Sequence, residues 1–183
     1  PVLQPFVEHY WAVHYKLPEE APYTQTVLSF PNVNLSFEQD DDGSRALIYG
    51  VPRRTFVREL KGSGRVLGVK FRAGGFYPFY GSQVAMLTGA IIPAASLFGD
   101  EIENCLDAVV NAEADAAMAK RAEQFLLGYV PARDSQAEFA HSIVQFTMDD
   151  RAISKVEQLS ERTGLSIRQI QRLFHKYVGV SPK

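Results

Sequence analysis

Four polar side chains near the carboxyl end have the types and spacing of a helix that contacts DNA bases. In SIRQIQRLFHKYVGVSPK (residues 166–183), Arg168, Gln171, Arg172 and His175 fall on one side of a helix at 100° per residue. The opposite side is apolar and consists of Ile170, Leu173, Phe174, Tyr177 and Val178. Arginine can bond guanine bidentately, and glutamine can bond adenine, in the major groove. The same stripe would suit a surface helix that only meets solvent, so both interpretations stay open.

Capping signals predict the two elements that would position this stripe. Ser154 and Glu157 have the spacing of a capping box, which predicts the start of a first helix. Gly164 can take a positive φ at low cost and so end that helix. Ser166 and Gln169 repeat the capping pattern at the start of the second helix. Two short helices joined by a tight turn predict a helix-turn-helix.

The charge distribution favours a polyanionic partner for this end of the chain alone. Residues 151–183 carry seven Lys or Arg and two Glu, a net charge of +5, whereas the other residues carry −7. Clustered cations attract phosphate. We therefore take Lys155, His175 and Lys176 as candidates for phosphate contacts beside the base-contacting residues Arg168 and Arg172.

The rest of the chain predicts an α+β fold. Between residues 24 and 72, short β-rich runs alternate with turn signals, which predicts an antiparallel β-rich barrel or sandwich. Residues 100–112, 115–129 and 138–148 place apolar residues at helical spacing. The helix at 115–129 is expected to pack within the chain, and a homodimer seam is the alternative.

The residues of the C-terminal pattern resemble the first helix-turn-helix of the AraC/XylS family of bacterial transcription regulators. The resemblance rests on Leu159, Gly164, Leu165-Ser166, Arg168, Gln171-Arg172-Leu173-Phe174, Val178-Gly179 and Ser181-Pro182. It implies a cytoplasmic regulator that binds double-stranded DNA, and small Ser160 stands where the family often has Ala. These regulators use two such units joined by a helix, which Ser181-Pro182 would begin. We therefore expect a C-terminally truncated chain that needs a second helix-turn-helix for full affinity and binds DNA weakly and with little specificity by itself.

The amino-terminal part resembles the cupin-like domain of such regulators less sharply. This resemblance rests on Pro5-Phe6-Val7, Tyr10-Trp11, Leu67-Gly68-Val69-Lys70-Phe71-Arg72 and Gly74-Gly75. It implies a sensor for a small-molecule effector or a site for chain pairing. The expected divisions are a β-rich sensor domain at 1–98, a helical connector at 99–133 and the helix-turn-helix half at 134–183.

Two groups of side chains in the β-rich part could bind a ligand. Aromatic residues are dense and should mostly form core, and the pocket candidates among them are Trp11, Tyr49 and Phe71. A basic cluster also lies within residues 53–72, which contain a single acidic residue, Glu59. The cluster consists of Arg53, Arg54, Arg58, Lys61, Arg65, Lys70 and Arg72. It could serve an anionic effector or a DNA-facing surface, although strand alternation favours a solvated outer face.

Other classes of function receive little support from the sequence. The four histidines lack the close spacing of a metal site, and no nucleophile-elbow or phosphate-loop pattern is present, so we expect no metal, no cofactor and no enzyme. Apolar stretches fall short of the roughly 20 residues of a spanning helix, so no membrane partner is expected. The single cysteine, Cys105, suits a buried apolar position better than a reactive thiol.

Overall fold

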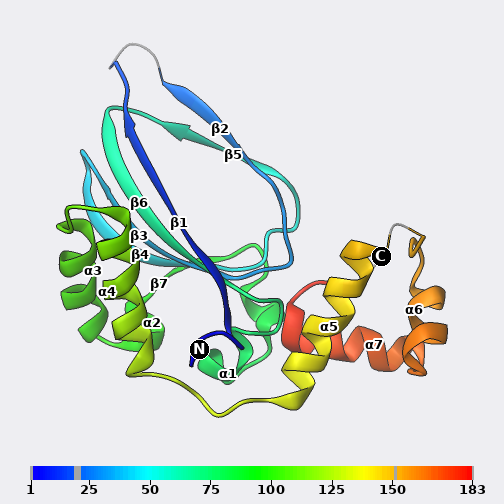
Figure 1. The fold of residues 1–183 in the computed structure, drawn as a ribbon. Helices are drawn as coiled ribbons and strands as arrows, with labels where there is room; N and C mark the ends of the chain where they lie inside the picture. The colour runs from blue at the N-terminus through cyan, green and yellow to red at the C-terminus, as the bar shows by residue number, and fades with distance from the viewer. Residues whose placement is uncertain (1, 19–21, 151, 183) are drawn as a thin grey trace.

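The computed structural model describes residues 2–18, 22–150 and 152–182. It confirms the α+β class: a β-rich part is followed by helices (Figure 1). The strands are β1 (Val7–Lys16), β2 (Tyr23–Val27), β3 (Asn34–Asp40), β4 (Gly43–Tyr49), β5 (Phe56–Leu60), β6 (Ser63–Phe71) and β7 (Ile91–Pro93). All the strand pairs are antiparallel, with β1-β6-β3-β4-β7 in one sheet and β2-β5 in another. Strands β1 and β7 were not among the predicted β-rich runs.

The two faces of the larger sheet have different chemistry. Leu35, Ile48 and Val69 share a row across three strands and are fully buried in the main core. Helices α3 (Glu101–Val110) and α4 (Asp115–Leu127) cover this apolar face. The opposite face carries Glu38, which bonds with Arg58 of β5, so it looks toward the two-stranded sheet.

Helices α3 and α4 confirm the helical patterns predicted at 100–112 and 115–129 and share one core with the sheet. Ala122 and Leu126 of α4 are fully buried there. At the carboxyl end of α4, Phe125 and Tyr129 pack on Phe98, with ring centroids 5.5 and 5.2 Å from it. This side of α4 therefore packs within the chain, and a homodimer stays a prediction.

Short helices connect these layers, and further helices form the carboxyl-terminal part. The connecting elements are α1 (Tyr77–Tyr80), the 3₁₀ turn η1 (Val84–Leu87) and α2 (Ala95–Phe98). Beyond α4 follow α5 (Ser135–Asp149), α6 (Val156–Thr163), α7 (Ile167–Leu173) and the π-helical turn η2 (Phe174–Val178). Asp134 caps α5 by accepting from the backbone of Gln136 and Ala137 at 2.8 and 3.0 Å. The predicted helix at 138–148 is thus confirmed.

The carboxyl-terminal helices have their own apolar cluster, which Ala73 joins from the β-rich part. At the junction, the rings of Tyr77 and Tyr177 meet edge to face at 4.5 Å between centroids. Nearby, the hydroxyl of Thr88 donates to the carbonyl of Gly179 at 2.5 Å. These contacts hold the end of η2 against α1 and η1.

Candidate nucleic-acid interface

The turn between α6 and α7 has the predicted geometry. Gly164 ends α6 with φ 69°, a left-handed conformation that suits a residue without a Cβ. The hydroxyl of Ser160 donates to the carbonyl of Leu165 at 2.6 Å, and that of Thr163 donates to the carbonyl of Leu159 at 2.6 Å. Ser160 therefore does more than keep a small volume, because its hydroxyl ties the helix to the turn.

The start of α6 differs from the predicted capping box by one residue. The N-cap is Lys155 rather than Ser154. The side chain of Gln158, not that of Glu157, reaches back and accepts from the backbone of Ser154 and Lys155 at 2.9 and 3.0 Å. An amide oxygen serves these free N–H groups as well as a carboxylate would.

The start of α7 confirms the second capping box. Ser166 is the N-cap and accepts from the backbone of Gln169 at 3.4 Å. In return, the side-chain oxygen of Gln169 accepts from the backbone of Ser166 at 2.8 Å. The first turn of α7 is thereby fixed, which matters because the first turns of a recognition helix carry the base contacts.

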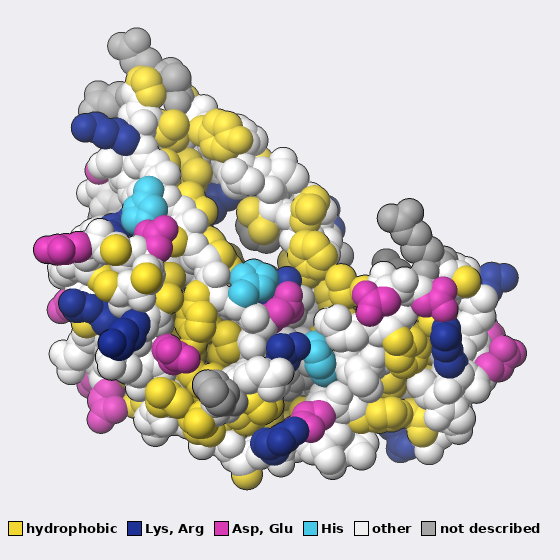
Figure 2. All heavy atoms as spheres, in the orientation of Figure 1, with side chains coloured by type: hydrophobic (Ala, Val, Ile, Leu, Met, Phe, Trp, Pro, Cys, Tyr) yellow, Lys and Arg dark blue, Asp and Glu magenta, His cyan; other side chains and the backbone are white. Residues whose placement is uncertain are grey.

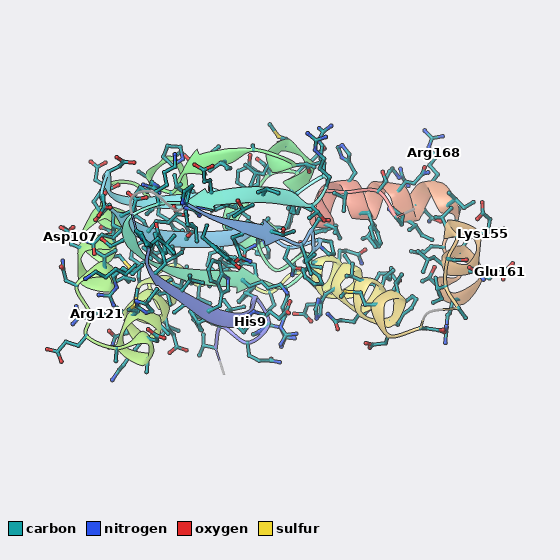
Figure 3. All side chains as sticks on the ribbon, turned by 90° about the horizontal axis from the view of Figure 1, so that it is seen from above. His9, Asp107, Arg121, Lys155, Glu161 and Arg168 are labelled. Carbon is teal, nitrogen blue, oxygen red and sulfur yellow. The ribbon has the colours of Figure 1, made fainter. Side chains whose placement is uncertain are left out.

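Helix α7 separates its polar and apolar residues as its periodicity predicts. Ile170 and Leu173 are buried against α5 and α6, and Phe174, Tyr177 and Val178 continue this buried side through η2. Arg168, Gln171 and Arg172 are exposed, and within the described parts of the chain their side chains make no hydrogen bond or ion pair. Figure 3 shows Arg168 pointing away from the body of the protein.

The three candidates for phosphate contact have different surroundings. Lys155, at the start of α6, and His175, in η2, are exposed. Lys176 lies over the rings of Tyr177 and Tyr77, 4.8 and 5.0 Å from their centroids. Hydrogen bonding to the hydroxyl of Tyr177 and then to that of Tyr77 raises the pKa of Lys176. Its ammonium group is therefore already engaged by two tyrosines where the carboxyl-terminal helices meet the β-rich part.

The three aromatic ligand candidates do not line one pocket. Phe71 is fully buried on the face covered by α3 and α4, where it packs on Phe76 at 4.9 Å between ring centroids. Trp11 and Tyr49 lie on the opposite face by strand register. Trp11 lies directly over Gly68, where a Cβ would come within 2.0 Å of the indole.

A buried carboxylate organises the face that holds Tyr49. The side chain of Glu38 is 1% exposed and accepts from Arg58 at 2.6 Å, Arg45 at 3.1 Å, Tyr49 at 2.7 Å and Ser36 at 2.9 Å. Burial raises the pKa of Glu38, but hydrogen bonds from Arg58, Tyr49 and Ser36, together with the charge of Arg58, outweigh burial and hold that pKa below its usual range. Burial and the bond to Glu38 raise the pKa of Tyr49 to about 12. No pattern in the sequence predicts this network.

Most of the basic cluster also has partners within the chain, and the predicted solvated outer face fits only its exposed members Arg53, Arg54 and Lys61. Arg58 bonds Glu38, and Arg65 donates to the carbonyls of Val110 and Ala112 at 2.8 and 2.7 Å. The other partnered members are Lys61 with Glu59, Lys70 with Glu8, and Arg72 with the Gln4 carbonyl and His141. Arg53 and Arg54 are exposed, and in the described chain neither makes an ion pair.

The other groups that could take part in chemistry, Cys105 and His141, are buried and half-buried in the fold. Burial raises the pKa of the Cys105 thiol to about 12, as suits an apolar position. Burial and the charge of Arg72 lower the pKa of His141. Within residues 2–18, 22–150 and 152–182, no three His, Cys, Asp or Glu side chains lie together as metal ligands would. None of the described helices combines the length and apolar character needed to cross a bilayer.

Comparisons with known proteins give one family match and a match among solved structures. A search of curated proteins finds no match. Among solved structures, a match is the crystal structure of the AraC-like transcriptional activator CuxR, at 12% identity over 93% of this chain and 72% of that one. Its TM-score of 0.32 is too low to establish a shared fold. A family model described as a domain of unknown function (DUF6597) matches residues 1–93. Because that match spans just over half of the chain, the protein belongs to the DUF6597 family.

Proposed function

We propose that this protein regulates transcription by binding double-stranded DNA, with α6 and α7 as its helix-turn-helix. The observation that carries the proposal is the exposed stripe of Arg168, Gln171 and Arg172, which has no partner within the described chain. An arginine whose charge is not used in the fold remains available for an external anion or base edge. The resemblance of residues 159–182 to an AraC/XylS helix-turn-helix supports the same function.

The proposed contacts divide into base edges and phosphates. Arg168, Gln171 and Arg172 contact bases because they occupy the exposed side of a capped helix. Lys155 and His175 contact phosphate, and Lys176 contributes less because it also holds two tyrosine rings. In this proposal the buried residues Ile170, Leu173 and Phe174 hold the helix in place. Such a protein would act in the cytoplasm of a bacterium.

We also propose that an effector or partner controls this function through the β-rich part. Figure 2 shows a hollow between the β2–β5 layer and the main sheet. Trp11 and Tyr49 belong to the sheet face on that side, whereas Phe71 does not. Homodimer formation and a second helix-turn-helix for full DNA affinity belong to the same proposal.

A second candidate function is a small-molecule-binding or protein-interaction module that does not bind DNA. The β2–β5 layer and its flanks favour it, because they expose Tyr23, Leu28 and Val57 to 54%, 63% and 62%. Exposed apolar surface of this kind often marks a protein contact.

The test is a DNA-binding measurement on the full-length protein and its Arg172→Ala variant. A duplex selected from a random pool would be varied one base pair at a time. We expect Arg172→Ala to cost about 1–3 kcal/mol and to remove discrimination at one position. Arg121→Ala is the matched control, because Figure 3 shows Arg121 at the opposite end of the molecule from Arg168.

Each result has a distinct meaning. Equal loss of affinity for every duplex would mean that Arg172 contacts phosphate and not a base. Loss no greater than that of Arg121→Ala would contradict a base contact. If the full-length protein selects no duplex at all, the interaction module becomes the better description.

A further inference from the structure

The polar stripe of α7 continues to His175 in η2, and η2 ends where the chain meets the β-rich part. Arg168, Arg172 and His175 follow one another along this side. Gly179 comes four residues, about one helical turn, after His175. Gly179 is buried and ends η2 with φ 98°, so the exposed stripe ends at His175, one turn before the contact with the β-rich part.

A loop of the β-rich part lies directly against that glycine. The hydroxyl of Thr88 donates to the carbonyl of Gly179 at 2.5 Å. A Cβ on Gly179 would lie 3.1 Å from the same hydroxyl and 3.1 Å from a methyl of Val84. The close approach is possible because residue 179 has no side chain.

The next residue of this loop meets the turn between β4 and β5. The N–H of Gly89 donates to the carbonyl of Val51 at 2.9 Å. A Cβ on Gly89 would lie 3.6 Å from the guanidinium nitrogen Nε of Arg53. Arg53 thus lies beside Gly89, the residue that follows Thr88 in the chain.

Arg53 and Arg54 are the two members of the basic cluster whose charge is not used in the described fold. Both are exposed, while the other five have acidic, carbonyl or histidine partners. Arg53 therefore brings an unpaired charge to the loop that contacts the end of η2, and Arg54 follows it in the chain.

We propose that Arg53 and Arg54 form a second DNA contact, to backbone phosphates beside the groove that α7 enters. This inference rests on the proposed function. A recognition helix contacts base edges with the residues of its N-terminal half, and η2 follows the other end of α7. The far end of the stripe therefore lies beyond the bases, where the phosphate strand runs. Arginine binds phosphate without regard to sequence.

The test compares charge variants on two labelled duplexes of unrelated sequence across a salt series. We expect Arg53→Gln/Arg54→Gln to weaken binding to both duplexes by the same factor, about tenfold at low salt. The slope of log K against log salt should fall in magnitude by about two. Arg53→Lys/Arg54→Lys keeps both charges and should retain the slope.

Lys120→Gln/Arg121→Gln is the matched control, because it removes two exposed charges from α4. If Arg53→Gln/Arg54→Gln behaves like this control while Arg168→Gln/Arg172→Gln loses binding, the phosphate contact is wrong and the proposed function stands. Loss in the Lys pair equal to that in the Gln pair would also overturn a charge contact. If the unaltered chain binds neither duplex at low salt, both proposals fail.

Discussion

Two arginine-bearing regions of this molecule use the same side chain in opposite ways. On the sheet, Arg45 and Arg58 surround Glu38, a carboxylate that is 1% exposed. On α7, Arg168 and Arg172 have no acidic or carbonyl partner in the described chain. The buried charge of Glu38 requires the first pair, whereas the second pair makes no interaction within the described fold. Partners, rather than residue type or exposure alone, therefore distinguish structural arginines from candidates for binding.

The largest effect that follows from this comparison is on the buried carboxylate. Glu38→Gln should lower the free energy of unfolding by about 3 kcal/mol, because it removes the charge that Arg45 and Arg58 neutralise. Chemical denaturation measures the change. Glu59→Gln is the control, since Glu59 is 54% exposed beside Lys61 and should change stability by less than about 1 kcal/mol.

The pH dependence adds a second readout to the same variant. The pKa of Glu38 is lowered in the folded protein, so its contribution is complete above the unfolded pKa of about 4.3 and is lost as pH falls through the folded pKa. The stability difference between the unaltered chain and Glu38→Gln should stay constant from neutral pH to about pH 5 and narrow in more acidic solution. A Glu38→Gln variant as stable as Glu59→Gln would contradict a structural role for the network.

The smallest effect on stability is expected for the arginines of α7. Arg168→Gln/Arg172→Gln should leave the free energy of unfolding within about 0.5 kcal/mol, because neither side chain has a partner to lose. Thermal and chemical unfolding give the comparison with Arg53→Gln/Arg54→Gln, whose arginines also make no ion pair in the described chain. A loss several times larger would mean that the α7 arginines stabilise the fold, and the contrast with Glu38 would disappear.

The parts of the fold that depend on local sequence could be predicted. The buried and exposed sides of α7 follow from a 3.6-residue period, and the box of Ser166 and Gln169 lies within four residues. The start of α6 is harder, because Ser154 with Glu157 and Lys155 with Gln158 are overlapping patterns with the same spacing. The choice between them depends on which side chain reaches the free backbone groups.

Features set by strand register could not be predicted from the sequence. In β1, apolar and polar residues do not alternate regularly along the chain, so the two-residue period that indicates a strand is weak. Glu38, Arg45, Tyr49 and Arg58 come from three strands and meet only because those strands pair and pack as they do. The same holds for Thr88 and Gly179, which are separated by 91 positions in the chain.

The most direct test of the central claim is an arginine-specific chemical footprint of the chain with and without duplex DNA. Modification of each arginine by a dicarbonyl reagent would be quantified by mass spectrometry. We predict that DNA protects Arg168 and Arg172 and leaves Arg121, at the far end of the molecule, unchanged (Figure 3). Equal reactivity of Arg168 and Arg172 in the free and DNA-saturated protein would contradict the claim that these arginines are kept for DNA.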